Sequence, residues 1–215
     1  GIVGQADNSI IENCTNKATI IGEDATSAGI AASSKNCTLN NCVNEGDVTG
    51  KKTSTAGITG TASTSSKVTN CINKGTITGN SNVTAGVVGA LTSNSTIDNC
   101  ANEGNVNGVQ YVGGIVGNFS GGLSLTNSYN KGNVKGTNAT ARYVAGIAGY
   151  TYINGSGKGN IANCYNLGDI TTEGGMKVAG ILGYLYSSVS LENCYNLGDV
   201  GSGNQITNTK NYKNC

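Results

Sequence analysis

The residues of this sequence that are best suited to covalent or metal chemistry are its eight cysteines. Most of them recur directly after an asparagine, and one unit has serine instead: Asn13-Cys14, Asn41-Cys42, Asn70-Cys71, Asn99-Cys100, Asn127-Ser128, Asn163-Cys164 and Asn193-Cys194. A disulfide scaffold pairs distant segments of a small fold, whereas a spacing close to 28 residues follows a sequence repeat. We therefore expect a column of free thiols. Bridges stay open for Cys37 with Cys42 and for Cys215 with a neighbour.

The sequence has few residues suited to metal binding or to acid–base chemistry. The sequence has no histidine, and a column offers one thiol per unit where zinc needs about four converging ligands. Calcium would need oxygen ligands in every unit, but that position is acidic only at Asp47, Asp169 and Asp199. The other carboxylates considered occupy outward repeat positions: Glu12, Glu45, Asp98, Glu103 and Glu192. The sequence predicts a protein that is not an enzyme and has no metal site or cofactor.

Tyrosine is the one feature that the repeat does not demand. All ten tyrosines and the only phenylalanine lie at or after Tyr111. Several fall at matching repeat positions and form the candidate ligand or partner face: Tyr129, Tyr150, Tyr152, Tyr165, Tyr184, Tyr186 and Tyr195. Strand alternation puts Ile147 and Ile181 inside, and it puts Val144, Val178 and the tyrosines that follow outside. These rings either shield the sheet beneath them or bind a sugar or protein.

A repeat must position all of these residues. Blocks of the form GhhG, with h aliphatic, start at seven positions: Gly1, Gly29, Gly57, Gly86, Gly114, Gly146 and Gly180. Each unit has three short, β-branched apolar segments separated by Gly or Asn, which favours strands over helices. Stacked units bury these segments against one another. We therefore predict an all-β, right-handed parallel β-solenoid of about seven coils of 28–34 residues, with three strands per coil.

The repeat also predicts the boundaries and the irregular parts. Residues 1–200 form the solenoid domain, and residues 201–215 form an irregular C-terminal cap or tail. Extra residues in the later units are expected to loop outward at 137–143, 152–159 and 172–176. The chain opens inside a repeat, so we expect it to be a piece of a longer protein.

Composition excludes two classes of partner. Charged residues make up 12% of the chain and the net charge is +1, which leaves no electrostatic footprint for nucleic acid. Apolar stretches are interrupted by Gly and are too short to span a bilayer, so no membrane insertion is expected. The richness in Asn, Thr, Ser and Gly is typical of extracellular surface proteins.

The pairing of GILG with NCYNLGD, clearest between Gly180 and Asp199, resembles the GLUG repeat of bacterial surface proteins. The resemblance implies a large secreted or wall-anchored bacterial protein, such as an adhesin or the non-catalytic part of an immunoglobulin A peptidase. The zinc-binding motif of such a peptidase is missing, so the resemblance implies no catalytic role.

These observations give three hypotheses for function. The first is a structural or adhesive repeat segment at a bacterial cell surface or in a secreted protein, with a host protein, a glycan or neighbouring repeats of the same protein as partner. The second is a carbohydrate-binding or carbohydrate-active β-helix that uses the tyrosine-rich flank. The third is a subunit of a self-assembling filament, since an uncapped coil exposes strand edges.

Overall fold

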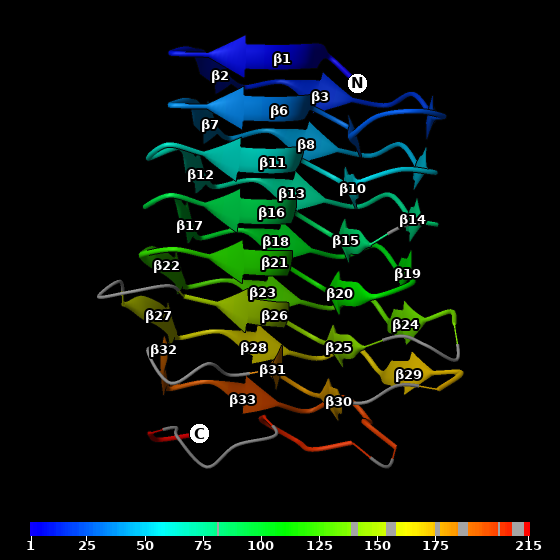
Figure 1. Cartoon of the computed structure of the whole chain (residues 1–215), viewed down its shortest axis with the longest axis vertical. Helices are drawn as coiled ribbons and strands as arrows, with labels where there is room; N and C mark the ends of the chain where they lie inside the picture. Colours follow the sequence, from blue (N-terminus) through cyan, green and yellow to red (C-terminus); the bar gives the residue numbers. More distant parts are fainter. Residues whose placement is uncertain are drawn as a thin grey trace.

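The computed structural model of the chain is a stack of coils wound about one axis, with the N-terminus at one end and the C-terminus at the other (Figure 1). The structure describes residues 1–80, 82–138, 142–153, 158–174, 177–184, 189–201, 203–207 and 213–215. Within these ranges the regular secondary structure is β-strand, and no helix there could cross a membrane. Each strand pairs in parallel with its equivalents in the adjacent coils, forming five sheets that run along the stack.

Three of the sheets have seven strands. Sheet A contains β1 (Val3–Asp7), β6 (Ala31–Lys35), β11 (Thr59–Ser63), β16 (Val88–Thr92), β21 (Val116–Ser120), β26 (Ala148–Tyr152) and β31 (Leu182–Tyr184). Sheet B contains β2 (Ile10–Glu12), β7 (Thr38–Asn40), β12 (Lys67–Thr69), β17 (Thr96–Asp98), β22 (Leu123–Thr126), β27 (Gly159–Ala162) and β32 (Val189–Glu192). Sheet C contains β3 (Thr15–Asn16), β8 (Val43–Asn44), β13 (Ile72–Asn73), β18 (Ala101–Asn102), β23 (Tyr129–Asn130), β28 (Tyr165–Asn166) and β33 (Tyr195–Asn196).

The other two sheets have six strands. Sheet D contains β4 (Ile20–Gly22), β9 (Val48–Gly50), β14 (Ile77–Gly79), β19 (Val106–Gly108), β24 (Val134–Gly136) and β29 (Ile170–Thr172). Sheet E contains β5 (Ser27–Ala28), β10 (Ser54–Ala56), β15 (Val83–Ala85), β20 (Tyr111–Gly113), β25 (Tyr143–Ala145) and β30 (Lys177–Ala179). The chain therefore winds through six complete coils and part of a seventh.

The predicted parallel β-solenoid is confirmed, and its three expected segments become sheets A, B and D. Each coil also has two further short strands, in sheets C and E. The sequence did not reveal them because neither sheet has a position that is aliphatic in every coil: the sheet C strands end in Asn, and the sheet E strands mix Val and Ala with Ser, Thr and Tyr. The predicted loops at 137–143, 152–159 and 172–176 each include residues outside the described ranges. The strands on both sides of these segments pair in register, so the extra residues do not shift the pairing between coils.

Two separate hydrophobic cores run along the stack. The large core lies between sheets A, B and C and includes Ile30, Leu91 and Phe119, which are fully buried. The small core lies between sheets D and E, and it consists of Val106, Val112, Val134, Val144, Ile170 and Val200. Val178 packs against the small core from a partly buried position. The prediction that Val144 and Val178 face outward is therefore wrong.

A corner explains that error. Val144 lies in β25 of sheet E and Ile147 begins the turn into sheet A, so Gly146 separates two strands that face different cores. Alternation holds only within one strand, and it cannot be carried across the corner. Ile147 and Ile181 are fully buried in the large core, as predicted.

The narrow region between the two cores, here called the waist of the coil, is filled by one asparagine from each coil. These asparagines are called the buried Asn ladder. Its members are Asn16, Asn44, Asn73, Asn102, Asn130, Asn166 and Asn196. From Asn16 to Asn166, each Nδ2 donates to the asparagine Oδ1 of the next coil at 2.6–2.8 Å. Every member also donates to a backbone carbonyl two residues ahead in its own coil. A polar waist is stable only when every group is paired, and this ladder pairs them continuously.

The small core has a defect in its N-terminal half. Thr55 and Thr84 occupy the sheet E position that Val112 and Val144 occupy in later coils. Both threonines are fully buried, and neither Oγ1 has a hydrogen-bond partner. Burying an unpaired hydroxyl costs about 1–3 kcal/mol.

We expect Thr84→Val to raise the free energy of unfolding by about 1–2 kcal/mol, because valine keeps the shape and removes the unpaired hydroxyl. Urea denaturation followed by circular dichroism measures the change. Thr69→Val is the matched control. The Thr69 hydroxyl donates to Asn40 Oδ1 at 3.0 Å, so its removal should lower the free energy of unfolding. A loss of stability in Thr84→Val would contradict the assignment.

The described part of the tail pairs with the last coil in the register of a further coil. Ile181 and Leu182 both donate their backbone N–H to Ile206 O, as Ile147 and Ala148 do to Ile181 O. Cys194 N donates to Cys215 Sγ at 3.3 Å, as Cys71 N does to Cys100 Sγ. Gln205 Oε1 accepts from Asn196 Nδ2 at 2.6 Å and so ends the buried Asn ladder.

Candidate functional site

Three of the predicted tyrosines form a continuous stack on sheet C, here called the tyrosine ladder: Tyr129, Tyr165 and Tyr195. They are direct partners in the parallel register of β23, β28 and β33. Successive ring centroids are 5.1 Å apart, with interplanar angles of 10° and 3°. Burial raises the pKa of Tyr129, and the nearby Lys131 charge partly offsets this. The rings cover one another's faces, so the ladder presents mainly ring edges and hydroxyls outward.

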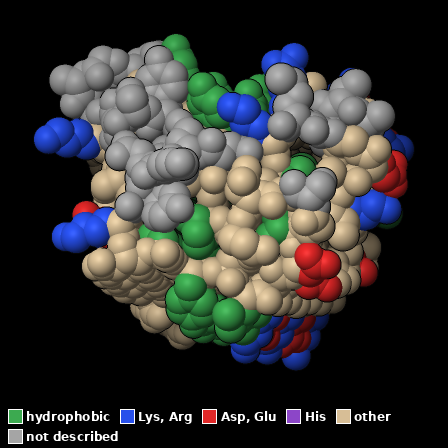
Figure 2. All heavy atoms as spheres, turned by 90° about the horizontal axis from the view of Figure 1, so that it is seen from below, with side chains coloured by type: hydrophobic (Ala, Val, Ile, Leu, Met, Phe, Trp, Pro, Cys, Tyr) green, Lys and Arg blue, Asp and Glu red, His purple; other side chains and the backbone are tan. Residues whose placement is uncertain are grey.

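The residues that lie two positions after the first residue of each sheet C strand form a column, and this column changes from charged to apolar along the stack. In the first five coils it alternates in charge, as Lys17, Glu45, Lys74, Glu103 and Lys131. Adjacent members form exposed ion pairs of 3.7–3.9 Å, which contribute little stability each. In coils six and seven the column becomes Leu167 and Leu197, which are 38% and 74% exposed. Figure 2 looks from the C-terminal end and shows exposed hydrophobic side chains beside a stack of Lys and acidic side chains.

A second set of asparagines lines the corner between sheets B and C. This exposed Asn ladder comprises Asn13, Asn41, Asn70, Asn99, Asn127, Asn163, Asn193 and Asn214, all with φ between 50° and 55°. Asparagine tolerates this left-handed conformation better than most residues. Most of these amides donate to the equivalent asparagine of the preceding coil, as Asn163 Nδ2 does to Asn127 Oδ1 at 3.1 Å. In coils five to seven the exposed Asn ladder runs beside the tyrosine ladder.

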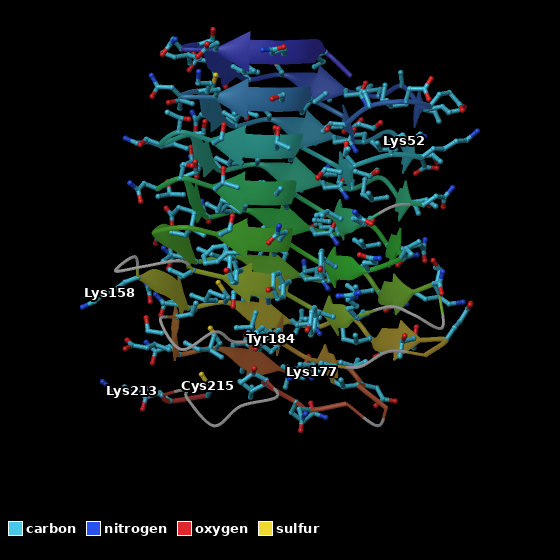
Figure 3. All side chains as sticks on the ribbon, in the orientation of Figure 1. Lys52, Lys158, Lys177, Tyr184, Lys213 and Cys215 are labelled. Atoms are coloured by element: carbon cyan, nitrogen blue, oxygen red, sulfur yellow. The ribbon has the colours of Figure 1, made fainter. Side chains whose placement is uncertain are left out.

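The other tyrosines that the structure describes gather in a different place, where sheets E and A meet. Tyr150 of sheet A stacks on Tyr111 and Tyr143 of sheet E, with ring centroids at 4.9 and 5.1 Å. Tyr184 packs against Tyr150 at 5.6 Å, and Lys177 lies over the Tyr184 ring at 4.5 Å (Figure 3). Burial, and then the neighbouring tyrosines, raise the pKa of Tyr150. This cluster closes the junction between two sheets.

The predicted residues therefore split into two groups. Tyr129, Tyr165 and Tyr195 belong to sheet C, whereas Tyr150, Tyr152 and Tyr184 belong to sheet A. Tyr152 is 39% exposed and its ring lies 6.4 Å from that of Tyr150. Tyr186 lies outside the described residues. Tyr111 and Tyr143 were missed, although each precedes its GhhG glycine by three positions, a shared offset that could have revealed them.

The cysteine column is present, and all eight thiols are free. Cys215 belongs to the column rather than being an exception, because its Sγ accepts from Cys194 N. Ser128 takes the same role in its coil, since its Oγ accepts from Cys100 N at 3.1 Å and donates to Thr126 O at 2.7 Å. A hydroxyl thus replaces the thiol without loss of contacts, which indicates a corner packing role.

Thiol reactivity should reflect this burial. Six of the cysteines are buried, Cys14 is half-buried and Cys215 is exposed. We expect Ellman's reagent to modify only Cys14 and Cys215 in the native protein, and all eight thiols after denaturation, because the thiolate is the reactive form. Rapid modification of a third thiol in the native state would show that the column opens.

Cys42 and Cys71 of this column are expected to make stability depend on alkaline pH. The neighbouring Cys100 thiol and burial raise the pKa of Cys71 from 9.0 to about 12. The Cys71 thiol and burial raise the pKa of Cys42 still further. A thiol whose pKa is raised in the folded state contributes its full stabilisation below pH 9, and that contribution is lost as the pH rises toward 12. We expect urea stability to fall over that window, and less steeply in Cys71→Ser.

Three of the carboxylates considered, Glu45, Asp98 and Glu103, make surface contacts with neighbouring coils. Glu45 and Glu103 take part in the surface ion pairs with lysines. Asp98 Oδ1 accepts from Thr126 Oγ1 and Asn127 Nδ2, at 2.6 and 2.7 Å. Among the described residues, no three His, Cys, Asp or Glu side chains converge in a way that could hold a metal ion.

Comparison with known proteins finds a motif match at the start of the chain and a structure with a similar fold. Residues 1–21 match the family model described as the GLUG motif, in agreement with the resemblance seen in the sequence. A crystal structure of a candidate immunoglobulin A1 protease from Bacteroides ovatus is similar, with a TM-score of 0.53 and 21% sequence identity. The alignment covers 88% of this chain and 66% of the chain in that structure. No curated protein matches the chain. At this identity the likeness shows a shared fold.

Proposed function

We propose that the chain is a non-enzymatic, structural β-solenoid segment of a bacterial surface or secreted protein, where it holds other parts of that protein apart. The observation that carries this proposal is the buried Asn ladder. It runs without a break from Asn16 to Asn196 and joins every coil to the next. A body joined in this way is stiff along its axis, and the coil spacing of about 4.8 Å gives seven coils a length of roughly 35 Å.

The chemistry of the side chains supports a structural role. The cysteines, the residue type most capable of catalysis here, serve as corner packing, and Ser128 replaces one of them. Glu45 and Glu103 take part in surface ion pairs, and the chain carries a net charge of +1. The GLUG motif match and the fold shared with the Bacteroides ovatus protein support an extracellular setting.

The location is testable on cells that produce the whole parent protein. Antibodies against this segment should label intact, unpermeabilised cells or appear in the culture medium. An antibody against a cytoplasmic protein is the control for leakage. Labelling that requires permeabilisation would overturn the proposed location.

We propose an adhesive role as well. It is supported by the edges of the tyrosine ladder on coils five to seven and by the exposed Leu167 and Leu197 on the last two coils. Filament formation remains a lesser alternative. Residues of the tail already pair with the last coil, at Ala179, Leu182 and Glu192, which works against end-to-end stacking. Sedimentation at high concentration distinguishes a monomer from a filament.

A further inference from the structure

The corner between sheets B and C brings three kinds of side chain together in coils five to seven. Along the chain, an exposed asparagine is followed two residues later by a tyrosine of the ladder: Asn127 and Tyr129, Asn163 and Tyr165, Asn193 and Tyr195. Two residues after the tyrosine come Leu167 and Leu197 in the last two coils. Coils one to four lack the set, because the tyrosine position there holds Thr15, Val43, Ile72 and Ala101.

Coils six and seven offer the same polar groups to solvent, from Asn163 with Tyr165 and from Asn193 with Tyr195. One N–H of Asn163 and one of Asn193 are used within the exposed Asn ladder, at 3.1 and 3.2 Å. An amide has a second N–H and a further lone pair, and these remain available at an exposed corner. Within the described residues, Tyr129 donates its hydroxyl to Glu103 Oε1 at 3.3 Å, while the hydroxyls of Tyr165 and Tyr195 make no hydrogen bond to protein. The surface is therefore a row of amides beside a row of phenols.

The spacing of the two rows is that of the coils. The ring centroids repeat at 5.1 Å, and the strands beneath repeat at about 4.8 Å. A ligand that contacts the same groups in every coil must itself repeat at this distance along the axis. Because the rings stack on one another, a single sugar cannot lie flat on them as it does on an isolated aromatic ring.

We propose that this face binds a linear β-1,4-linked pyranose chain lying parallel to the coil axis, with one sugar per coil. Such a chain is extended and advances by close to one coil spacing per sugar. Its sugars alternate in orientation, and amides and phenols suit both orientations because they donate and accept. The exposed methyl groups of Leu167 and Leu197 can cover apolar C–H surface of the sugars.

The charge pattern favours a neutral polysaccharide over a charged polymer. The neighbouring column is charged from Lys17 to Lys131 and becomes uncharged in the coils where tyrosines continue. Lys131 lies 5.0 Å from the Tyr129 ring centroid and marks the upper limit of the uncharged strip. This ligand goes beyond the structural role proposed above and does not depend on it.

Calorimetric titration of the whole chain with cello- and chito-oligosaccharides of increasing length tests the proposal. We expect affinity to rise with each added sugar until three coils are covered, and then to level off. Malto-oligosaccharides, whose α-1,4 linkage makes a curved chain, should not bind. Absence of binding to both β-1,4 series, or equal binding of the α-1,4 series, would overturn the proposal.

Variants separate binding from folding. Tyr165→Phe keeps the ring stack and removes one hydroxyl, so affinity should fall about tenfold while the melting temperature is kept. Tyr184→Phe, in the other tyrosine cluster, is the matched control and should bind as the unchanged chain does. Unchanged affinity in Tyr165→Phe would overturn the proposal. So would attachment to cells that is lost when the cells are treated with protease but kept after glycosidase treatment, since that result indicates a protein partner.

Discussion

Gly104→Ala is expected to destabilise the solenoid by more than about 4 kcal/mol, a loss large enough to unfold the middle of the stack. A Cβ on Gly104 would meet the carbonyl oxygen of Gly75 in the coil above, with the Gly75 carbonyl carbon at 2.6 Å and Lys74 O at 2.8 Å. All of these atoms are backbone, so relief requires two coils to separate. Separation of these two coils would break the hydrogen bond that Glu103 N donates to Asn73 O at 2.7 Å. Urea denaturation measures the loss.

A glycine of the first coil offers a control for this substitution. Gly4→Ala should leave stability unchanged to within about 0.5 kcal/mol, because a Cβ there meets no atom within 4 Å. The sequence contains a natural version of the substitution: Ala18 stands in the first coil at the position that Gly46 and Gly75 occupy below it. A Gly104→Ala protein that melts like the parent would show that the coils are not packed in contact at this corner.

Asn102→Ala is expected to cost about 3–5 kcal/mol, the second largest effect. The Asn102 side chain is fully buried and makes three hydrogen bonds, to Asn73 Nδ2, Gly104 O and Asn130 Oδ1, at 2.6–2.7 Å. Alanine would leave all three partners buried and unpaired, and each such group costs about 1–3 kcal/mol. Chemical denaturation gives the free energy of unfolding.

Asn99→Gly, three residues earlier in the same coil, is the control for this substitution. Asn99 donates to Asn70 Oδ1 at 2.7 Å, but the bond is exposed and water can replace it. Glycine also accepts the φ of 50° at this position without strain. We expect a loss below about 1 kcal/mol. Equal losses for the two variants would mean that the waist of the coil is accessible to water.

The fold could be predicted from the sequence because the same pattern of apolar and turn residues recurs in every unit. From the second coil on, the aliphatic of each GhhG block, the aliphatic before the Asn-Cys or Asn-Ser pair and the one near the end of each unit are buried, as Ile58, Val68 and Ile77 show for one coil. Val68 and Ile77 lie in strands, and Ile58 lies in the bend just before β11. Periodicity also predicted the thiol column, since a residue that recurs every coil must stack. These features follow from spacing alone.

What spacing could not predict is the division of each coil into two cores. Val144 and Ile147 look like neighbours on one strand, but the corner at Gly146 sends them into different cores. The separation of the tyrosines into two groups follows from the same corner, because Tyr143 and Tyr150 meet across it at 5.1 Å. The role of Asn214 and Cys215 was hidden too, since Gln205 stands where earlier coils have the first glycine of GhhG.

The buried Asn ladder also gives the molecule a direction. Every Nδ2 points toward the coil that follows in sequence, from Asn16 to Asn44 and onward to Asn196. The side-chain amide dipoles therefore add along the axis instead of cancelling, and the two faces of any coil differ: one offers acceptors and the other donors. Gln205 meets the donor face with its Oε1 at 2.6 Å. A coil transplanted in the opposite sense would set acceptor against acceptor, so chimeric solenoids built from this chain must keep its polarity.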